Sequence, residues 1–205
     1  MIPTAPLRVR NHLAEIILTA LEKPEARRAL VVLGEADAAP PDWLSPDLDC
    51  RPLVRQRALS AAAALAELPA RHRDSRADIL NAAAALFDAH LYFEVHELLE
   101  PVWRDAGGGE REALQGLIQI AVGYQHLANG NLAGARALLD EGRRRLDGRT
   151  LEGLDLDAFG QKVARTSDRI QKLDWRTVPP FPRPQSGPRA GGAAGKAVNP
   201  RKELS

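Results

Sequence analysis

Cysteine is nearly absent from this 205-residue chain, and aromatic residues make up only 4% of it. The single cysteine, Cys50, excludes an intrachain disulfide framework and a zinc site built from several cysteines. Long apolar runs are missing too, because no stretch approaches the roughly 20 apolar residues that a membrane-spanning helix needs. The sequence therefore predicts a protein that does not cross a membrane, and we expect it to be soluble and cytoplasmic.

An excess of charge of either sign is also lacking. The chain has 28 basic and 27 acidic residues, which gives a formal net charge of +1. A dedicated nucleic-acid-binding protein would be expected to carry a strong basic surface, so this balance argues against that class. A small ligand, a protein partner and a homo-oligomer all stay open as binding partners.

Small apolar residues are what the chain does contain. Hydrophobic residues make up 44% of the sequence, with many alanine and leucine runs and few alternating β-branched stretches. This composition predicts an all-α fold, a multihelical bundle of antiparallel helices. Apolar spacing and proline or glycine stops place helices over residues 6–22, 25–33, 51–68, 75–90, 91–106, 110–128, 132–146 and 156–173.

Changes in composition divide the chain into three parts. Residues 1–70 are predicted to form an N-terminal helical extension, which includes a proline-rich loop pinned by Trp43 and Leu44. Residues 71–175 are predicted to form the core of the helical bundle. Residues 176–205 are rich in proline and glycine, so we expect a disordered tail, with the disorder beginning beyond residues 179–181.

The stretch FEVHELLEPVW, residues 93–103, carries an unusual set of side chains for one helix. At about 100° per residue, its valines and leucines occupy one side. The other side carries Phe93, His96, Glu97, Glu100 and Trp103. Because two large aromatic residues frame the ionisable groups, we expect this side to be partly covered. Charged groups in such a place need partners.

The following helix can supply those partners. In LQGLIQIAVGYQH, Gln115, Gln119 and His126 share a stripe, while Gly116 and Gly123 share a side where another helix could approach closely. The two helices together predict a semi-buried polar pocket. Its candidate residues are Phe93, Glu94, His96, Glu97, Glu100, Trp103, Gln115, Gln119 and His126.

These two stretches, YFEVHELLEPVWR and LQGLIQIAVGYQHLANGNLAGARALL, resemble the domain of unknown function 309 family. That family pairs an F-E-x-H-E-x-L-E-x-x-W helix with an L-Q-G-L-I-Q helix. The resemblance covers residues 79–146 and implies a multihelical bundle without an established activity. His90 and Leu91 depart from the pattern, because the family usually has a glycine or a small polar turn there.

Three interpretations of the polar residues follow. His96 and Glu100, spaced i and i+4, could share a metal ion beside Glu97, with Glu94 or His126 as a third ligand. A structural network in which Glu100 and Gln119 orient His96 is favoured over this metal site. His96 could also act as a general base, although the motif contains no serine or cysteine nucleophile.

The sequence therefore favours an uncharacterised helical protein whose polar pocket binds a small ligand or a partner. A metal-dependent, hydrolase-like enzyme that uses His96, Glu97 and Glu100 is one alternative. A helical protein-interaction module is the other. The sequence identifies neither a cofactor nor a reaction.

Overall fold

The computed structural model describes residues 5–184, and these residues fold almost entirely into helices. The α-helices are α1 (Leu7–Ala20), α2 (Pro24–Gly34), α3 (Arg51–Ala66), α4 (Arg76–Asp88), α5 (Tyr92–Asp105), α6 (Gly108–Ala128), α7 (Leu132–Leu146) and α8 (Leu156–Ser167). Short 3₁₀ segments cover Asp42–Cys50, Ile170–Lys172 and Trp175–Thr177. The strands β1 (Thr150–Leu151) and β2 (Leu154–Asp155) form one antiparallel hairpin. The predicted all-α class is confirmed.

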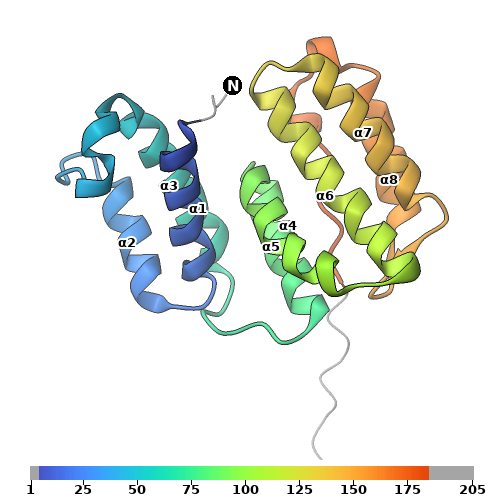
Figure 1. Cartoon of the computed structure of the whole chain (residues 1–205), viewed down its shortest axis with the longest axis horizontal. Helices are drawn as coiled ribbons and strands as arrows, with labels where there is room; N and C mark the ends of the chain where they lie inside the picture. Colours follow the sequence, from blue (N-terminus) through green and yellow to red (C-terminus); the bar gives the residue numbers. More distant parts are fainter. Residues whose placement is uncertain (1–4, 185–205) are drawn as a thin grey trace, which may run out of the picture.

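The helices form two groups that lie side by side (Figure 1). We call α1, α2 and α3, with the 3₁₀ segment Asp42–Cys50, the N-terminal lobe. The remaining helices, α4 to α8, form the C-terminal lobe. Leu44 is buried and the ring of Trp43 lies 4.5 Å from that of His12, so the proline-rich loop is anchored as predicted.

Helices α6 and α7 approach each other very closely because glycines face each other across their contact. A Cβ built on Gly116 would lie 2.9 Å from the carbonyl oxygen of Gly142, and one built on Gly142 would lie 2.8 Å from that of Gly116. A Cβ on Gly123 would come 3.2 Å from the backbone nitrogen of Leu139. The predicted close approach along Gly116 and Gly123 is therefore made by α7.

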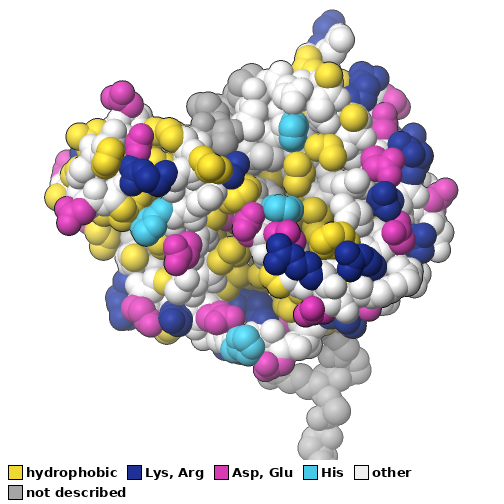
Figure 2. Space-filling model, viewed as in Figure 1, with side chains coloured by type: hydrophobic (Ala, Val, Ile, Leu, Met, Phe, Trp, Pro, Cys, Tyr) yellow, Lys and Arg dark blue, Asp and Glu magenta, His cyan; other side chains and the backbone are white. Residues whose placement is uncertain are grey.

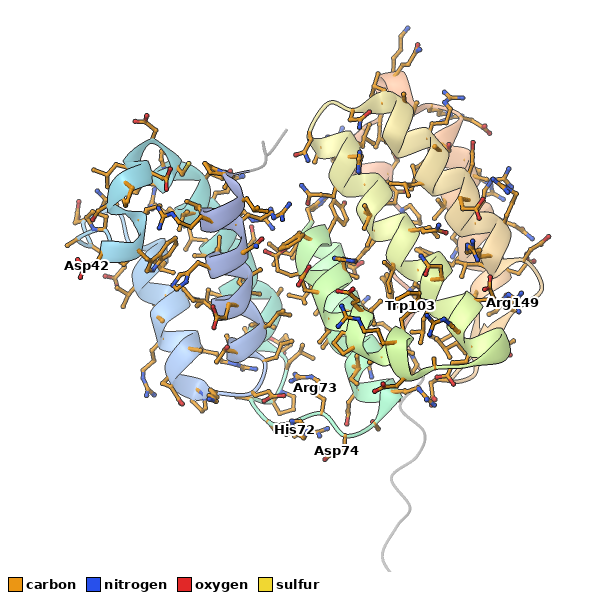
Figure 3. All side chains as sticks on the ribbon, in the orientation of Figure 1. Asp42, His72, Arg73, Asp74, Trp103 and Arg149 are labelled. Carbon is orange, nitrogen blue, oxygen red and sulfur yellow. The ribbon has the colours of Figure 1, made fainter. Side chains whose placement is uncertain are left out.

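Two arginines hold the connection between the lobes. Arg27 donates to the carbonyl oxygens of Ala20 and Leu68, and Arg73 donates to that of Leu21 at 2.7 Å. These carbonyls lie at the C-terminal ends of α1 and α3, where helices leave acceptors without partners and favour positive charge. Figure 3 shows His72, Arg73 and Asp74 in the segment that joins the lobes.

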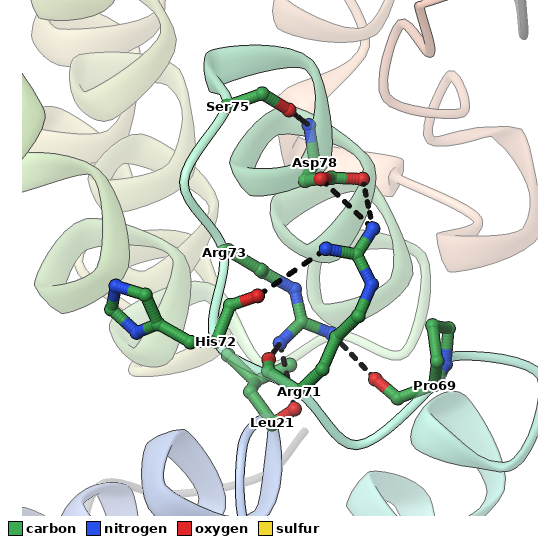
Figure 4. Close-up of polar contacts among 7 residues, drawn as sticks. All are labelled: Leu21, Pro69, Arg71, His72, Arg73, Ser75 and Asp78. Atoms are coloured by element: carbon green, nitrogen blue, oxygen red, sulfur yellow. Dashed lines mark hydrogen bonds and ion pairs between the residues drawn. The ribbon is translucent and has the colours of Figure 1, made fainter.

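At the start of the second lobe, Arg71 bonds both carboxylate oxygens of Asp78 at 2.9 Å (Figure 4). These bonds lower the pKa of Asp78. Ser75 caps α4 by accepting from the backbone N–H of Asp78, as its position before the helix predicts.

The proline-rich segment around Phe181, beyond which the tail was predicted to be disordered, is packed. Phe181 is 2% exposed, its ring centroid lies 5.2 Å from that of Phe87, and its N–H donates to Asp88 at 2.9 Å. One large aromatic side chain fits here between α4 and α8 despite the prolines around it. Residues 185–205 lie outside the described part of the chain. The last α-helix also ends earlier than predicted, at Ser167.

Across residues 5–184, no helix is both long enough and apolar enough to cross a membrane.

Candidate functional site

A tight turn sets the start of the motif helix α5. His90 N–H donates to the carbonyl of Phe87, and Leu91 N–H donates to that of Leu86, both at 2.9 Å. This pair of bonds is the Schellman motif that closes a helix. Its left-handed position is usually glycine, but here His90 holds it with φ of 61°. The chain therefore reverses between α4 and α5 within a few residues.

The structure brings His96, Glu97 and Glu100 together on α5. One ligand atom from each lies within 4.8 Å of the other two. All three side chains are partly exposed, at 30%, 37% and 30%. Figure 2 shows histidine, acidic and basic side chains gathered on the face where α5 and α6 lie. These three side chains thus form a partly exposed cluster at the protein surface.

The hydrogen bonds in this cluster differ from the predicted network. His96 Nδ1 lies 3.0 Å from Glu97 Oε1, whereas Glu100 accepts from Arg104 at 2.7 Å. The Oε1 atom of Gln119 is buried and has no hydrogen-bond partner among the described residues. The predicted bonds from Glu100 and Gln119 to His96 are wrong, because Glu97 and Arg104 lie nearer on the same helix.

Glu94 faces away from this cluster and into the contact between the lobes. It is fully buried, and Arg57 Nη2 on α3 lies 2.8 and 2.6 Å from its two carboxylate oxygens. Glu94 therefore cannot serve as a ligand beside His96. Sequence reasoning missed Arg57, which lies 37 positions away and carries no local signal.

The two aromatic residues that frame the cluster are each covered by an arginine. The guanidinium of Arg10 on α1 lies 4.0 Å from the centre of the Phe93 ring, and that of Arg111 lies 4.0 Å from the centre of the Trp103 ring. Arg111 also donates to the carbonyls of Trp103 and Arg104 at the end of α5. Figure 3 places Trp103 beside α6. Phe93 thus belongs to the lobe contact, and Trp103 fixes α5 against α6.

The glutamines of α6 follow the same side of the helix as Arg111. Gln115 and Gln119 lie four and eight residues after Arg111, and this spacing keeps them on one stripe. Because Arg111 contacts Trp103 and Tyr124 stacks on Tyr92 with ring centroids 5.5 Å apart, α5 and α6 run antiparallel. Trp103 lies opposite Arg111, and Tyr92 lies opposite Tyr124. Counting residues along both helices between these two contacts places Gln119 of α6 at the level of His96 of α5.

His126 lies at the other end of α6, away from His96. Its Nδ1 is 2.8 Å from Asn131 Nδ2, in the turn before α7. This contact gives His126 a local structural role at the α6–α7 turn. The structure therefore provides neither of the two predicted additional ligands, Glu94 and His126, near the cluster.

Comparison with known proteins supports the resemblance that the motifs indicate. The family model described as Domain of unknown function (DUF309) matches residues 80–138. The matched segment contains the whole of α5 and α6, including the cluster, and leaves the N-terminal lobe and its connection to α4 outside. No curated protein and no solved structure matches the chain.

Proposed function

We propose that His96, Glu97 and Glu100 bind a divalent metal ion, through which the protein binds a small oxygen-bearing ligand. The observation that supports this most is the convergence of three ligand atoms within 4.8 Å on one helix face. One imidazole and two carboxylates suit several divalent metals, including Zn²⁺ and Mn²⁺.

Such a site would be open on its outer side. Three protein ligands leave coordination positions for water or for an oxygen of a ligand. Gln119, at the level of His96 on the neighbouring helix, has a buried oxygen that needs a hydrogen-bond donor, and water on the ion would supply one. An ion held this way can bind a carboxylate or a phosphate, and it can also lower the pKa of bound water for hydrolysis.

Glu100 allows the proposal to be distinguished from a purely structural role. Its pair with Arg104 joins partly exposed side chains, and such pairs contribute only about 0–1 kcal/mol. We therefore expect Glu100→Gln to leave the melting temperature of the metal-free protein nearly unchanged. A buried network would instead lose about 1–3 kcal/mol when one member is removed.

Metal binding is tested by isothermal titration of the full-length, untagged protein with Zn²⁺ and then Mn²⁺. One ion should bind per chain, and Glu100→Gln should weaken binding by more than about tenfold, since even outer-shell partners of a metal affect affinity by 10–100-fold. Glu141→Gln is the matched control, because Glu141 also pairs with an arginine four residues on, at 3.0 Å, with 34% exposure. Absence of binding, or equal binding by both variants, would reject the metal site.

A protein-interaction role is the second candidate, and the N-terminal lobe carries the observation that favours it. Val31 on α2 is 53% exposed and Leu59 on α3 is 48% exposed. A Cβ on Gly34 would touch the Leu59 side chain, so these apolar residues lie on neighbouring helix faces. Light scattering of the native protein and of Leu59→Ser across a range of concentrations tests whether this surface mediates self-association. A monomer at all concentrations would exclude that form of interaction.

A further inference from the structure

Arg104 places a positive charge against one of the three proposed metal ligands. Its Nη2 atom donates to Glu100 Oε1 at 2.7 Å, and Glu100 is also one of the carboxylates that converge with His96. The Arg104 side chain is 65% exposed, and it pairs with no other acid in the described part of the chain. An ion that binds Glu100 therefore competes with Arg104 for this carboxylate.

The charges around a bound ion indicate which ligand would complete the site. Glu97 and Glu100 together cancel the two positive charges of the ion, and His96 would bind it as the neutral imidazole. Arg104 then adds one positive charge. A ligand with one negative charge matches this sum, whereas a dianion would exceed it. A carboxylate has that charge, and its two oxygens can bind the ion and the planar guanidinium at the same time.

A buried oxygen on the neighbouring helix adds a second requirement. Gln119 lies at the level of His96, and its Oε1 atom is buried without a hydrogen-bond donor among residues 5–184. An unpaired buried acceptor costs free energy, so such atoms in proteins usually have a donor. The ligand should therefore carry a donor close to its carboxylate. A hydroxyl on the adjacent carbon is a small group that meets this need and can bind the same ion through its oxygen.

We propose that the metal site on α5 binds a small 2-hydroxycarboxylate, the class that includes glycolate and lactate. This inference rests on the proposed function, because the ion is part of the binding site. One carboxylate oxygen and the hydroxyl oxygen bind the ion, the other carboxylate oxygen accepts from Arg104, and the hydroxyl donates to Gln119 Oε1. The ligand draws Arg104 away from Glu100, so the ion and the hydroxy acid each strengthen the binding of the other.

Isothermal titration of the full-length, untagged protein with Zn²⁺ tests this assignment, and Mn²⁺ serves as a second ion. The buffers contain sodium chloride, acetate, glycolate or sulfate at equal ionic strength, with a correction for the binding of the ion to each anion. Acetate should raise the affinity for the ion by at least about fivefold, the lower end of usual coupling between two ligands. Glycolate should raise it further, and the dianion sulfate should raise it less than acetate does.

Arg104→Gln tests the role of the guanidinium. In chloride this variant should bind the ion more tightly than the native protein, because nothing competes for Glu100. It should also lose most of the gain from acetate. Arg144→Gln is the matched control, because Arg144 is 63% exposed and pairs with Glu141 at 2.8 Å on α7, and it should respond to acetate as the native protein does.

Gln119→Met tests the role of the buried oxygen. Methionine keeps a side chain of similar length and removes the acceptor that lacks a donor. The metal-free variant should therefore be at least as thermally stable as the native protein. In this variant the gain in affinity from glycolate should fall to the gain from acetate.

Failure of the metal site and failure of its assigned ligand give different results. No binding of either ion in any buffer would reject the metal site and this assignment together. Binding of the ion with equal affinity in all four buffers would overturn the assignment alone. Equal gains from acetate and glycolate, a larger gain from sulfate than from acetate, or a native gain from glycolate in Gln119→Met would do the same.

Discussion

Arg57 of the N-terminal lobe neutralises Glu94 of the family segment inside the contact between the lobes. One guanidinium nitrogen bonds both carboxylate oxygens, and the two side chains are only 10% and 1% exposed. Glu94 is thus a buried charge within the matched family segment, and its partner comes from outside that segment. The N-terminal lobe is therefore part of what makes the motif helix stable in this chain.

Removing only one member of this pair should be severely destabilising. Arg57→Ala leaves a buried carboxylate without a partner, and such changes cost about 3–5 kcal/mol. Urea unfolding monitored by circular dichroism measures this loss.

The double variant Arg57→Met with Glu94→Leu replaces the pair by apolar side chains and should regain most of the stability. Arg144→Ala is the control, since Arg144 pairs with Glu141 at the surface, and its effect should stay within about 1 kcal/mol. If Arg57→Ala were as mild as this control, Glu94 would not depend on Arg57.

The close contact of α6 with α7 should depend on the absence of side chains at its glycines. Gly142→Ala places a methyl group against the carbonyl of Gly116, and a backbone atom cannot move away cheaply. We expect a loss of about 1–3 kcal/mol, the usual cost of overpacking, in thermal unfolding.

Gly109→Ala is the control for this change. The nearest atom to a Cβ there is the end of a flexible arginine, Arg149 Nη1, at 3.4 Å. Because alanine also favours the helix, Gly109→Ala should be neutral or stabilising. Comparable losses for both variants would show that the α6–α7 approach is looser than the structure indicates.

What the sequence predicted well depends on short-range geometry. The cluster of His96, Glu97 and Glu100 lies within one helical turn, so the period of the helix alone brings these side chains together. The same period predicted that Gly116 and Gly123 face an approaching helix. The partner of Glu94 could not be predicted this way, because Arg57 reaches it only through the docking of two lobes.

For a related reason, composition alone does not show how firmly the start of the C-terminal segment is packed. Proline and glycine lower the average tendency of residues 176–205 to pack. Averaging over the whole segment hides one buried aromatic residue, Phe181, whose pocket is formed by Phe87 of α4 and Phe159 of α8. The cavity that accepts a side chain is a property of the folded bundle and has no local sequence signal.

Phe181 should therefore contribute strongly to stability although it lies in a proline-rich segment. Phe181→Ala removes a ring that is 2% exposed, and such truncations cost about 3–5 kcal/mol. The melting temperature of the full-length variant measures this. Pro182→Ala, at a less buried neighbour, is the control and should change little. A melting temperature of Phe181→Ala equal to that of the control would place the segment outside the folded core.

His90 should make the protein more sensitive to mild acid. Burial lowers the pKa of His90, and nearby Asp88 offsets this only in part. Since the pKa is about 6.5 in the unfolded chain, the unfolded state binds the proton more readily than the folded state. The contribution of His90 to the free energy of unfolding is therefore complete above pH 6.5 and decreases as the pH falls from there through the lowered pKa.

The variant His90→Asn tests this contribution. Asparagine tolerates the left-handed backbone, so His90→Asn should fold and lose less stability than the native protein between pH 7.5 and 5.5. Urea unfolding across that range measures the difference, with His72→Asn, an exposed histidine paired with Glu22 at 2.9 Å, as the control that keeps the acid sensitivity. Parallel curves for His90→Asn and the native protein would mean that His90 is protonated as readily in the folded state as in the unfolded one.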